Sequence, residues 1–533
     1  MGHAHDYATA IMHRGRVPME PADFVPDWAD RPRKAKYYPG APSFPLPGTS
    51  YPAGATVAAG CLPGGGPSGP ALPFSLPLLS GMLLDSYGLV GRRLGVQANT
   101  DLGALPHYPQ ANWSRGTASG GGLYPVSVYW VSGPSGPPAP GVHYYSPPHH
   151  SMQRLLAGDV SGEVRAALGG YGEETDQYLV LGVKYWQNSF KYNSFSFHAV
   201  SMDVGTVLQS WQIWARARGL RLAPALWFDE ARLTRLLGLD GDEEGLFAVV
   251  PLLWEPSSRP AEAPPRQDGA ERPAVRLRDR ERSRTVLGFD ALRRIHRATA
   301  EHAAARPAPD ALDGCAPAPL TGSAEPLALP PAAFPDVDVR TAVRARRSSF
   351  GRFDATVPVT AAQLATTLAA CAAARPCAGA EPEGTPGLAR LYAFVNHVEG
   401  IEPGAYAYEP KSHTLRLVTP GAPGSFLQRN YFLSNYNLEQ AGAVVVPTVR
   451  TTAVLDAVGD RGYVLVNAIV GAIAQTFYTA AAAFGLGAGV ALGFDNISYV
   501  EELGLEDSGE APLLIMLLGN ERPEPADFRS DIA

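Results

Sequence analysis

The stretch Arg115-Gly-Thr-Ala-Ser-Gly-Gly-Gly-Leu-Tyr-Pro125 indicates how the chain is organised. It leads directly into Val126-Ser-Val-Tyr-Trp-Val131, whose β-branched and aromatic residues predict a strand. Glycine has no Cβ, so a run of glycines lets main-chain N–H groups come close to a bound molecule. A plain glycine-rich turn is the simpler interpretation of three glycines alone. The flanking Ser119 and the Leu-Tyr-Pro that follows favour a binding loop instead.

The composition is that of a large folded protein. The 533 residues suit two domains of ordinary size, and 45% hydrophobic with 18% charged residues permit a large core. A net charge of -7 argues against nucleic acid as the main partner. The four cysteines have neither a CxxC pair nor metal-ligand spacing, so no metal site is expected: Cys61, Cys315, Cys371 and Cys377.

The N-terminus has no apolar core typical of a signal peptide, and the cysteine usage fits a reducing compartment. We therefore expect a cytoplasmic protein. His3 and His5 could bind a metal, but a flexible terminus is the favoured interpretation.

One segment is long enough to cross a membrane. Val464–Leu486 carries no charged residue over 23 positions. It contains Asn467 and Gln475, however, and lacks the flanking Lys and Arg that anchor a membrane span. A helix buried in the core of a large protein is the better interpretation, and no membrane partner is expected.

Composition and predicted elements divide the chain into four parts. These are a Pro- and Gly-rich N-terminal extension at 1–75, a first domain at 76–254, a linker with one helix at 255–335, and a second domain at 336–533. The linker contains the charge run Arg276–Arg284, in which both signs are mixed, and such a run is usually a solvated face.

The two domains are copies of one unit. Shifting the sequence by 266 residues superimposes four features without a gap over about forty residues, so chance is a poor explanation. The matched pairs are Gln209 with Gln475, Gly219-Leu220 with Gly485-Leu486, Phe228-Asp229 with Phe494-Asp495, and Leu237–Leu239 with Leu503–Leu505.

The Ser-Gly-Gly-Gly-Leu-Tyr-Pro run resembles the flavin-covering loop of the SagB-type azoline dehydrogenases, a branch of the nitroreductase-like flavoproteins. The resemblance implies an α+β, nitroreductase-like fold. Such proteins are ordinarily homodimers that hold two flavins at the subunit interface. This chain is then the dimer fused into one polypeptide, a pseudo-dimer, with FMN as its cofactor.

By the same resemblance, three pieces of sequence make up a flavin site. The phosphate is assigned to Arg346, Arg347 and Ser348. The flavin ring is assigned to the Gly485-Leu-Gly487 loop, to the backbone of Leu492 and Gly493 near N5, and to Gln475, whose amide could equally be satisfied within the core. The covering loop is assigned to Ser119, Gly120, Gly121, Leu123, Tyr124 and Pro125.

The two copies do not retain the same pieces. The first keeps the covering loop, but it has Gly219-Leu-Arg-Leu-Ala223 in place of the Gly-Leu-Gly loop and no matching Arg-Arg-Ser. The second keeps both of those and lacks the covering loop. The chain is therefore expected to build one complete site from both copies, and to bind one FMN.

The catalytic residues implied by the resemblance are Lys191 and Tyr192. Their counterparts 266 residues later are Ala457 and Val458, so the pair occurs once. Oxidising an azoline removes a proton from the azoline ring, which requires a base on the side of the substrate opposite the flavin. Either side chain could be that base. An isolated Lys-Tyr pair is usually exposed on the surface and has no catalytic role. The neighbouring aromatic residues favour a partly buried pocket here.

The implied reaction is FMN-dependent oxidation of thiazoline or oxazoline rings to thiazoles or oxazoles in a ribosomally made peptide such as a thiopeptide, with O2 as the electron acceptor. The implied partners are the azoline-containing precursor peptide and a cyclodehydratase complex. Two alternatives stay open. One is a flavin oxidase of a carrier-bound or small-molecule substrate, and the other is a non-catalytic scaffold of a peptide-modifying complex.

Overall fold

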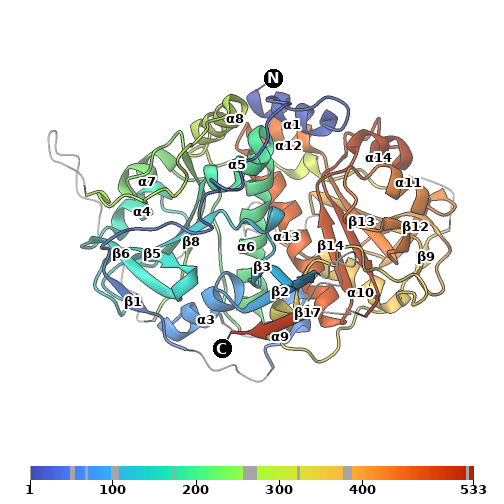
Figure 1. Cartoon of the computed structure of the whole chain (residues 1–533), viewed down its shortest axis with the longest axis horizontal. Coiled ribbons are helices and arrows are strands. Elements are labelled where there is room, and N and C mark those ends of the chain that lie inside the picture. The colour runs from blue at the N-terminus through green and yellow to red at the C-terminus, as the bar shows by residue number, and fades with distance from the viewer. Residues whose placement is uncertain are drawn as a thin grey trace.

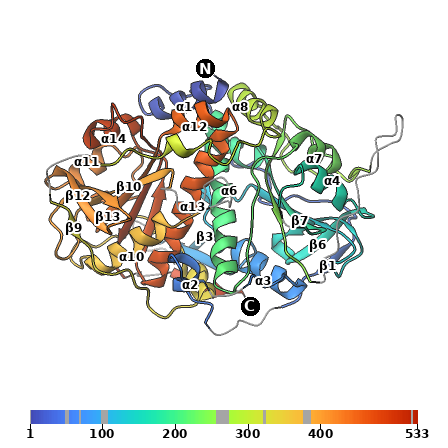
Figure 2. The same cartoon turned by 180° about the vertical axis from the view of Figure 1, so that it is seen from behind.

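A computed structural model describes residues 2–48, 54–66, 70–97, 107–172, 174–255, 273–320, 325–375, 387–523 and 527–532. We call the residues up to 255 the N half and those from 325 the C half. Figure 1 shows one sheet in each half, with two long helices standing side by side between them. The same two helices occupy the centre from behind, with α2 and α10 beside them (Figure 2).

The N half folds around one antiparallel sheet with the strand order β1-β6-β5-β4-β7-β8. Its strands are β1 (Ser43–Pro45), β4 (Val126–Ser132), β5 (Gly141–Ser146), β6 (Ser151–Ala157), β7 (Gln177–Lys184) and β8 (Glu244–Pro251). Its helices are α1 (His3–His13), α2 (Val57–Cys61), α3 (Leu76–Ser86), α4 (Ser161–Ala167), α5 (Trp186–Tyr192), α6 (Ser196–Arg216) and α7 (Glu230–Leu236).

The C half repeats this plan in a sheet with the order β14-β16-β13-β10-β11-β12-β9. Its strands are β9 (Leu327–Ala328), β10 (Ala389–Val395), β11 (Gly404–Glu409), β12 (Thr414–Pro420), β13 (Ala443–Val449), β14 (Gly487–Ala491) and β16 (Ile515–Gly519), with β15 (Ala511–Pro512) pairing to β13. Its helices are α9 (Val339–Ala345), α10 (Ala361–Ala372), α11 (Gly424–Arg429), α12 (Thr451–Val458), α13 (Gly462–Ala483) and α14 (Asn496–Leu503). Helix α8 (Asp290–Glu301) lies between the halves in sequence.

A third sheet joins the two halves. The C-terminal strand β17 (Asp527–Asp531) pairs antiparallel with β2 (Gly91–Gln97), which in turn pairs with β3 (His107–Ser114). The chain end that belongs to the C half is thus a strand of a sheet from the N half.

The duplication read from the sequence is confirmed by the topology. The order β6-β5-β4-β7-β8 of the N half corresponds to β12-β11-β10-β13-β16 of the C half. Helices α6 and α13 begin at Ser196 and Gly462, and helices α7 and α14 begin at Glu230 and Asn496, in each case 266 residues apart. The fold is therefore α+β and consists of two fused copies of one unit.

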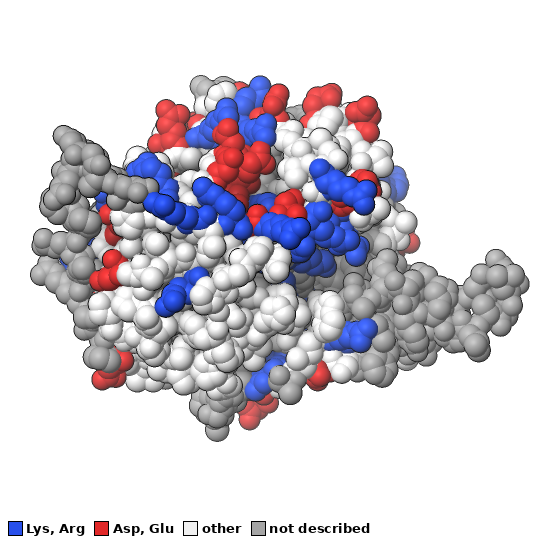
Figure 3. Space-filling view, turned by 60° about the vertical axis from the view of Figure 1, so that its left-hand side comes forward, with Lys and Arg blue, Asp and Glu red and all other residues white. Residues whose placement is uncertain are grey.

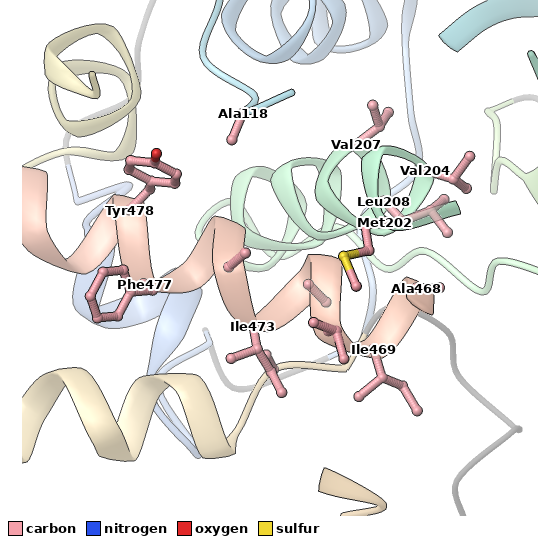
Figure 4. Close-up of a cluster of buried hydrophobic side chains, with 14 of the residues drawn as sticks. Ala118, Met202, Val204, Val207, Leu208, Ala468, Ile469, Ile473, Phe477 and Tyr478 are labelled. Carbon is pink, nitrogen blue, oxygen red and sulfur yellow. The ribbon is translucent and has the colours of Figure 1, made fainter. Parts of the chain in front are cut away.

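The central helices α6 and α13 cross at two glycines that occupy equivalent positions, Gly205 and Gly471. A Cβ built on Gly205 would lie 2.1 Å from the Ala468 carbonyl oxygen, and one on Gly471 would lie 2.1 Å from the Met202 carbonyl oxygen. The two backbones approach so closely that no larger residue fits at either position. Apolar side chains from both helices surround the crossing (Figure 4).

Helix α13 is long and apolar enough to cross a membrane, but its whole apolar window is buried inside the protein. Asn467 Nδ2 donates a hydrogen bond to the Tyr463 carbonyl within the helix, at 2.8 Å. The expected buried core helix is confirmed, because α6, α9 and α10 pack around it.

The expectation of a flexible N-terminus was wrong. Residues 3–13 form α1, whose Tyr7 and Ile11 are buried, and Tyr7 Oη donates to the Ser194 carbonyl at 2.6 Å. His5 Nε2 lies 2.8 Å from Asp456 Oδ1 of the C half. The apolar face of α1 is covered by contacts distant in sequence, which local composition does not reveal.

Candidate active site

The loop from Ser119 to Pro125 adopts a conformation that depends on its glycines. Gly121 and Gly122 have φ values of 62° and 64°, and Tyr124, although not a glycine, has φ 52°. Leu123, Tyr124 and Pro125 are buried and anchor the loop, whereas Gly121 is exposed at its tip. The loop thus exposes main chain without a side chain at Gly121, and its Leu123–Pro125 end is fixed in the core.

Ser119 and Asp203 brace this loop from within. Ser119 Oγ donates to Asp203 Oδ2 at 2.6 Å and accepts a hydrogen bond from Tyr124 N at 2.8 Å. Gly120 N donates to Asp203 Oδ1, also at 2.8 Å. Asp203 lies on α6, and burial raises its pKa to about 7, although the two hydrogen bonds from the loop oppose the shift.

Asp203 was missed by the sequence analysis. A signal for it exists in the duplication, because the equivalent position 266 residues later is Ile469. The carboxyl group occurs only in the copy that has the loop. Burying a carboxyl group costs free energy, so its presence on a buried helix indicates a role beyond packing.

The C half holds the loop by its main chain. Arg346 Nε donates to the Gly116 carbonyl and its terminal nitrogen donates to the Arg115 carbonyl, both at 3.0 Å. Gln475 Oε1 accepts from Ala118 N at 2.8 Å, and its Nε2 donates to Gly116 O at 3.2 Å. Of the two interpretations left open for Gln475, the structure shows the amide satisfied by loop backbone.

A cavity of about 200 Å³ lies beside this contact. It is lined by Ala345, Arg346, Arg347, Ser349, Tyr478, Ala482, Gly485, Leu486, Ala488 and Glu521. The two arginines and Gly485-Leu486 that the sequence analysis assigned to a flavin therefore face one space. Ser348 is not among the lining residues, since its Oγ is hydrogen-bonded to Tyr478 Oη at 2.8 Å and Ser349 lines the cavity in its place.

Glu521 places a carboxylate among the arginines of this cavity. Arg347 donates to Glu521 Oε2 at 2.6 Å, and an Arg352 terminal nitrogen lies 3.8 Å from Oε1. A Cβ on Gly487 would lie 2.4 Å from Glu521 Cγ, so only glycine fits opposite this side chain. The cavity thus already holds one anion against Arg347.

Strand β14 connects the cavity to the second predicted part of the site. Gly487 begins the strand at the arginine end, and Leu492 and Gly493 follow its other end. A strand of five residues separates the two ends by roughly 17 Å. The Leu492 carbonyl accepts a hydrogen bond from Arg14, and the Gly493 carbonyl accepts from Phe432 N at 2.8 Å. Burial lowers the pKa of Arg14 to about 10. Arg14 comes from the N-terminal extension and was not predicted.

Lys191 and Tyr192 lie at the end of α5, against the exposed tip of the loop. A Cβ built on Gly121 would be 2.5 Å from Tyr192 Oη and 2.7 Å from Lys191 Nζ. The Lys191 nitrogen also lies 4.6 Å from the centre of the Tyr192 ring and 5.8 Å from that of Trp28. The structure therefore brings the predicted pair and the predicted loop into contact.

Arg14 and Phe195 connect this pair to Leu492. The Arg14 guanidinium lies 5.0 Å from the centre of the Phe195 ring, and that ring is 6.1 Å from the Tyr192 ring. The loop, the Lys-Tyr pair, the arginine cavity and Leu492 thus form one continuous region at the junction of the two halves.

Comparison with known proteins agrees with this architecture. Residues 343–520 match the model of the nitroreductase family. A protein of Methanocaldococcus jannaschii that is named a nitroreductase is 31% identical over 137 residues, which are 24% of this chain and 63% of that protein. The aligned part therefore spans less than two thirds of that relative.

A crystal structure described as a nitroreductase from Anabaena variabilis superimposes with a TM-score of 0.70 at 20% sequence identity. The superposition covers 98% of this chain and 100% of that one. The chain as a whole has a nitroreductase-like fold, and residues 343–520 of its C half are the part that matches the nitroreductase family model.

Proposed function

We propose that this protein is a dehydrogenase that binds one FMN between its halves and oxidises azoline rings in a ribosomally made peptide. The observation that carries the proposal is the contact of Lys191 and Tyr192 with the exposed Gly121 of the loop. A proton acceptor and a loop suited to a flavin meet at one place, and each occurs in only one of the two copies.

The residues of the arginine cavity fit the phosphate of FMN. Arg346 and Arg347 both line it, and Glu521 already occupies the position of an anion opposite Arg347. Charge-assisted hydrogen bonds from arginine to phosphate are among the stronger hydrogen bonds in proteins. Bound FMN would place its phosphate where Glu521 now meets Arg347, and Leu492, Gly493 and the Ser119 loop would hold its ring.

The reaction removes a proton and a hydride from an azoline ring. Bound FMN supplies the hydride acceptor, and O2 takes the electrons in the end. Lys191 or Tyr192 accepts the ring proton, because both polar groups lie at the loop tip where a substrate can reach them. The buried Trp186 and Phe190 on the same helix hold the pair in a largely apolar setting.

The assignment of thiazoline or oxazoline peptides rests on the Lys-Tyr pair and the Ser-Gly-Gly-Gly-Leu-Tyr-Pro loop, which resemble those of azoline dehydrogenases. An azoline ring arises by cyclodehydration of a cysteine, serine or threonine residue, so a cyclodehydratase supplies the substrate. Such peptides are made and modified in the cytoplasm, which is the location we propose.

The test replaces the proposed base and leaves the flavin residues intact. Lys191→Ala and Tyr192→Phe are expected to keep the flavin absorption spectrum. Azole formation, followed as a mass decrease of about 2 Da per ring, should slow by about 10²–10⁴, the contribution of a positioned general base. Lys411→Ala, which changes an exposed lysine of the C half, serves as the matched control.

Parental rates in both variants would show that the pair takes no part in the reaction. A parent protein that binds no flavin at all would favour the scaffold alternative. Flavin binding together with oxidation of small azolines but not of peptides would favour the small-molecule alternative.

A further inference from the structure

Two segments that are distant in sequence form a strongly basic surface beside the proposed site. Residues 31–36 and 276–284, here called the basic strip, contain nine Lys and Arg but only two Asp and Glu, in a chain whose net charge is -7. Arg280 N donates to the Tyr37 carbonyl at 2.8 Å, and Arg33 donates to the Arg280 carbonyl at the same distance. The segments therefore run side by side, and Figure 3 shows a face on which many Lys and Arg side chains gather, with Asp and Glu side chains among them.

The two acidic residues of the strip share one ion-pair partner within the protein. Asp279 and Glu281 each lie 2.6 Å from Lys184 Nζ of β7. Lys36 is buried and paired with Glu244. These ion pairs leave the exposed arginines and Lys34 as the charges that face outward.

Four of these outward charges have no carboxylate partner within the described ranges. They are Arg31, Lys34, Arg282 and Arg284, all of which are exposed. The nearby Asp30 carboxylate accepts hydrogen bonds from the main-chain nitrogens of Arg284 and Thr285, and these bonds, together with the charges of Arg284 and Arg282, lower its pKa, so Asp30 offsets one of the positive charges. The charge run that the sequence analysis treated as an ordinary solvated face is thus an excess of positive charge.

Lys34 connects the basic strip to the loop. Its Nζ donates to the Gly122 carbonyl at 2.7 Å and lies 5.9 Å from the centre of the Tyr124 ring. Although the Lys34 residue is exposed overall, partial desolvation of its ammonium against the loop, and then the charges of Arg115, Arg31 and Lys191, lower its pKa. One end of the strip is therefore close to Lys191, the proposed base.

An apolar patch borders the strip. Val25, Trp28, Val286 and Leu287 are all exposed, Val25 to 81% and Trp28 to 49%. The segments that carry them are held together by the Asp30 hydrogen bonds and by the rings of Phe24 and Phe289, 5.2 Å apart. Exposed large apolar side chains next to a charged surface are typical of a binding face.

We propose that the basic strip and its apolar patch bind an acidic peptide segment that also carries apolar residues, the part of the substrate peptide outside the ring being oxidised. This inference rests on the proposed function for the link between that segment and the reacting ring. The excess of positive charge attracts the acidic residues, and Trp28 and its neighbours receive the apolar ones. The segment 276–284 spans at most about 30 Å, so a peptide of about ten residues is long enough to cover it.

The test measures binding without any oxidation. The probe is a fluorescein-labelled peptide of about twelve residues built from Asp, Glu, Leu and Ser, with an isomer in which Asn and Gln replace Asp and Glu. Its fluorescence anisotropy is followed with the full chain. The triple variant Arg31→Glu, Arg282→Glu, Arg284→Glu should weaken binding by at least about tenfold, and salt should weaken binding to the parent protein.

Trp28→Ala should weaken binding separately from the charge reversal, and Arg429→Glu, an exposed arginine of α11, is the matched control. Equal affinity for the acidic peptide and its neutral isomer would overturn the proposal. So would tighter binding of a single-stranded oligonucleotide of similar charge, since the surface would then be one for nucleic acid.

The two proposals fail in distinguishable ways. An acidic peptide that binds through the basic strip to a protein unable to oxidise azolines contradicts the proposed function alone. Equal azole formation by the parent and the triple variant on a substrate peptide held far below saturation contradicts the binding surface alone.

Discussion

Arg346 and Arg347 are neighbours in sequence but make different contacts. Arg346 is buried and donates to two carbonyls of the loop in the other half. Arg347 faces Glu521 in the cavity. Removing Arg346 therefore leaves the Arg115 carbonyl without this donor, which costs about 1–3 kcal/mol, and leaves the Gly116 carbonyl with Gln475 as its donor, whereas removing Arg347 affects chiefly the anion position.

Replacing both arginines by alanine should release FMN. Each charge-assisted hydrogen bond to the phosphate contributes about 1.5–3 kcal/mol. Flavin absorbance after a desalting column is the measurement, with far-ultraviolet circular dichroism to confirm folding and Arg429→Ala as control. The single variant Arg346→Ala should lower the melting temperature more than Arg347→Ala. Full flavin retention by the folded double variant would place the phosphate elsewhere.

Asp203 makes stability depend on pH. Its pKa is raised from 3.8 to about 7 in the folded protein, so its ionisation is easier in the unfolded chain. Its contribution to stability is therefore full below about pH 4, decreases as the pH rises, and is lost once the pH passes the folded pKa.

Asp203→Asn does not ionise and should escape this loss. The melting temperature of the variant relative to the parent is expected to rise between about pH 4 and pH 7 and to stay level above that. Thermal unfolding of both proteins at several pH values measures the difference. A difference independent of pH would mean that the carboxyl group ionises normally.

Several site residues could not be predicted, for physical reasons. The Lys-Tyr pair and the loop were predicted because each is a short local motif. The structure brings Lys191 and Tyr192 against the loop. Arg14 and Glu521 act through contacts with residues 478 and 174 positions away, Leu492 and Arg347 respectively. Neither lies in a local motif, so only the folded chain reveals them.

At the scale of elements, the difference between expectation and structure is clearest at Gly487. The Gly-Leu-Gly sequence predicted a loop, but Gly487 begins β14 because its backbone pairs with Gly519 of β16. Long-range pairing overrides the weak strand preference of glycine. The strand expected at 126–131 and the buried helix expected at 464–486 were, by contrast, predicted to within a few residues, as β4 and α13, because their apolar runs specify them locally.

The crossing of α6 and α13 yields a prediction for two glycines. Gly205→Val or Gly471→Val would drive a side chain into the backbone of the facing helix and should destabilise the protein by about 1–3 kcal/mol or more. The melting temperature and the soluble yield are the measurements. Gly314→Ala, at an exposed position with open space around it, is the control and should leave both unchanged.

At the scale of the whole molecule, the two halves share a plan but differ at their interfaces. In the C half, Arg347 and Gly485-Leu486 line a cavity. In the N half, Leu72 N donates to the Gly219 carbonyl at 2.8 Å, and Phe74 pairs with Trp254 in an isolated bridge. The segment that contains Leu72 therefore packs against Gly219, in the N-half counterpart of the Gly-Leu-Gly sequence. A symmetric dimer would be expected to hold its second flavin at this place.

The duplication was readable from the sequence because an offset of 266 needs no knowledge of the fold. The packing of α1 and the sheet formed by β17, β2 and β3 were not, since each joins segments hundreds of residues apart. The predicted domain limits remain predictions. Cys377 and residues 256–272 of the predicted linker lie outside the described residues.

In the function we propose, two unequal halves build one flavin site. Titration of the flavin-free chain with FMN, followed by flavin fluorescence or calorimetry, tests it most directly. We expect one FMN per 533-residue chain. Two FMN bound per chain with similar affinity would contradict it, because the N half would then hold a phosphate without the Arg346-Arg347 pair.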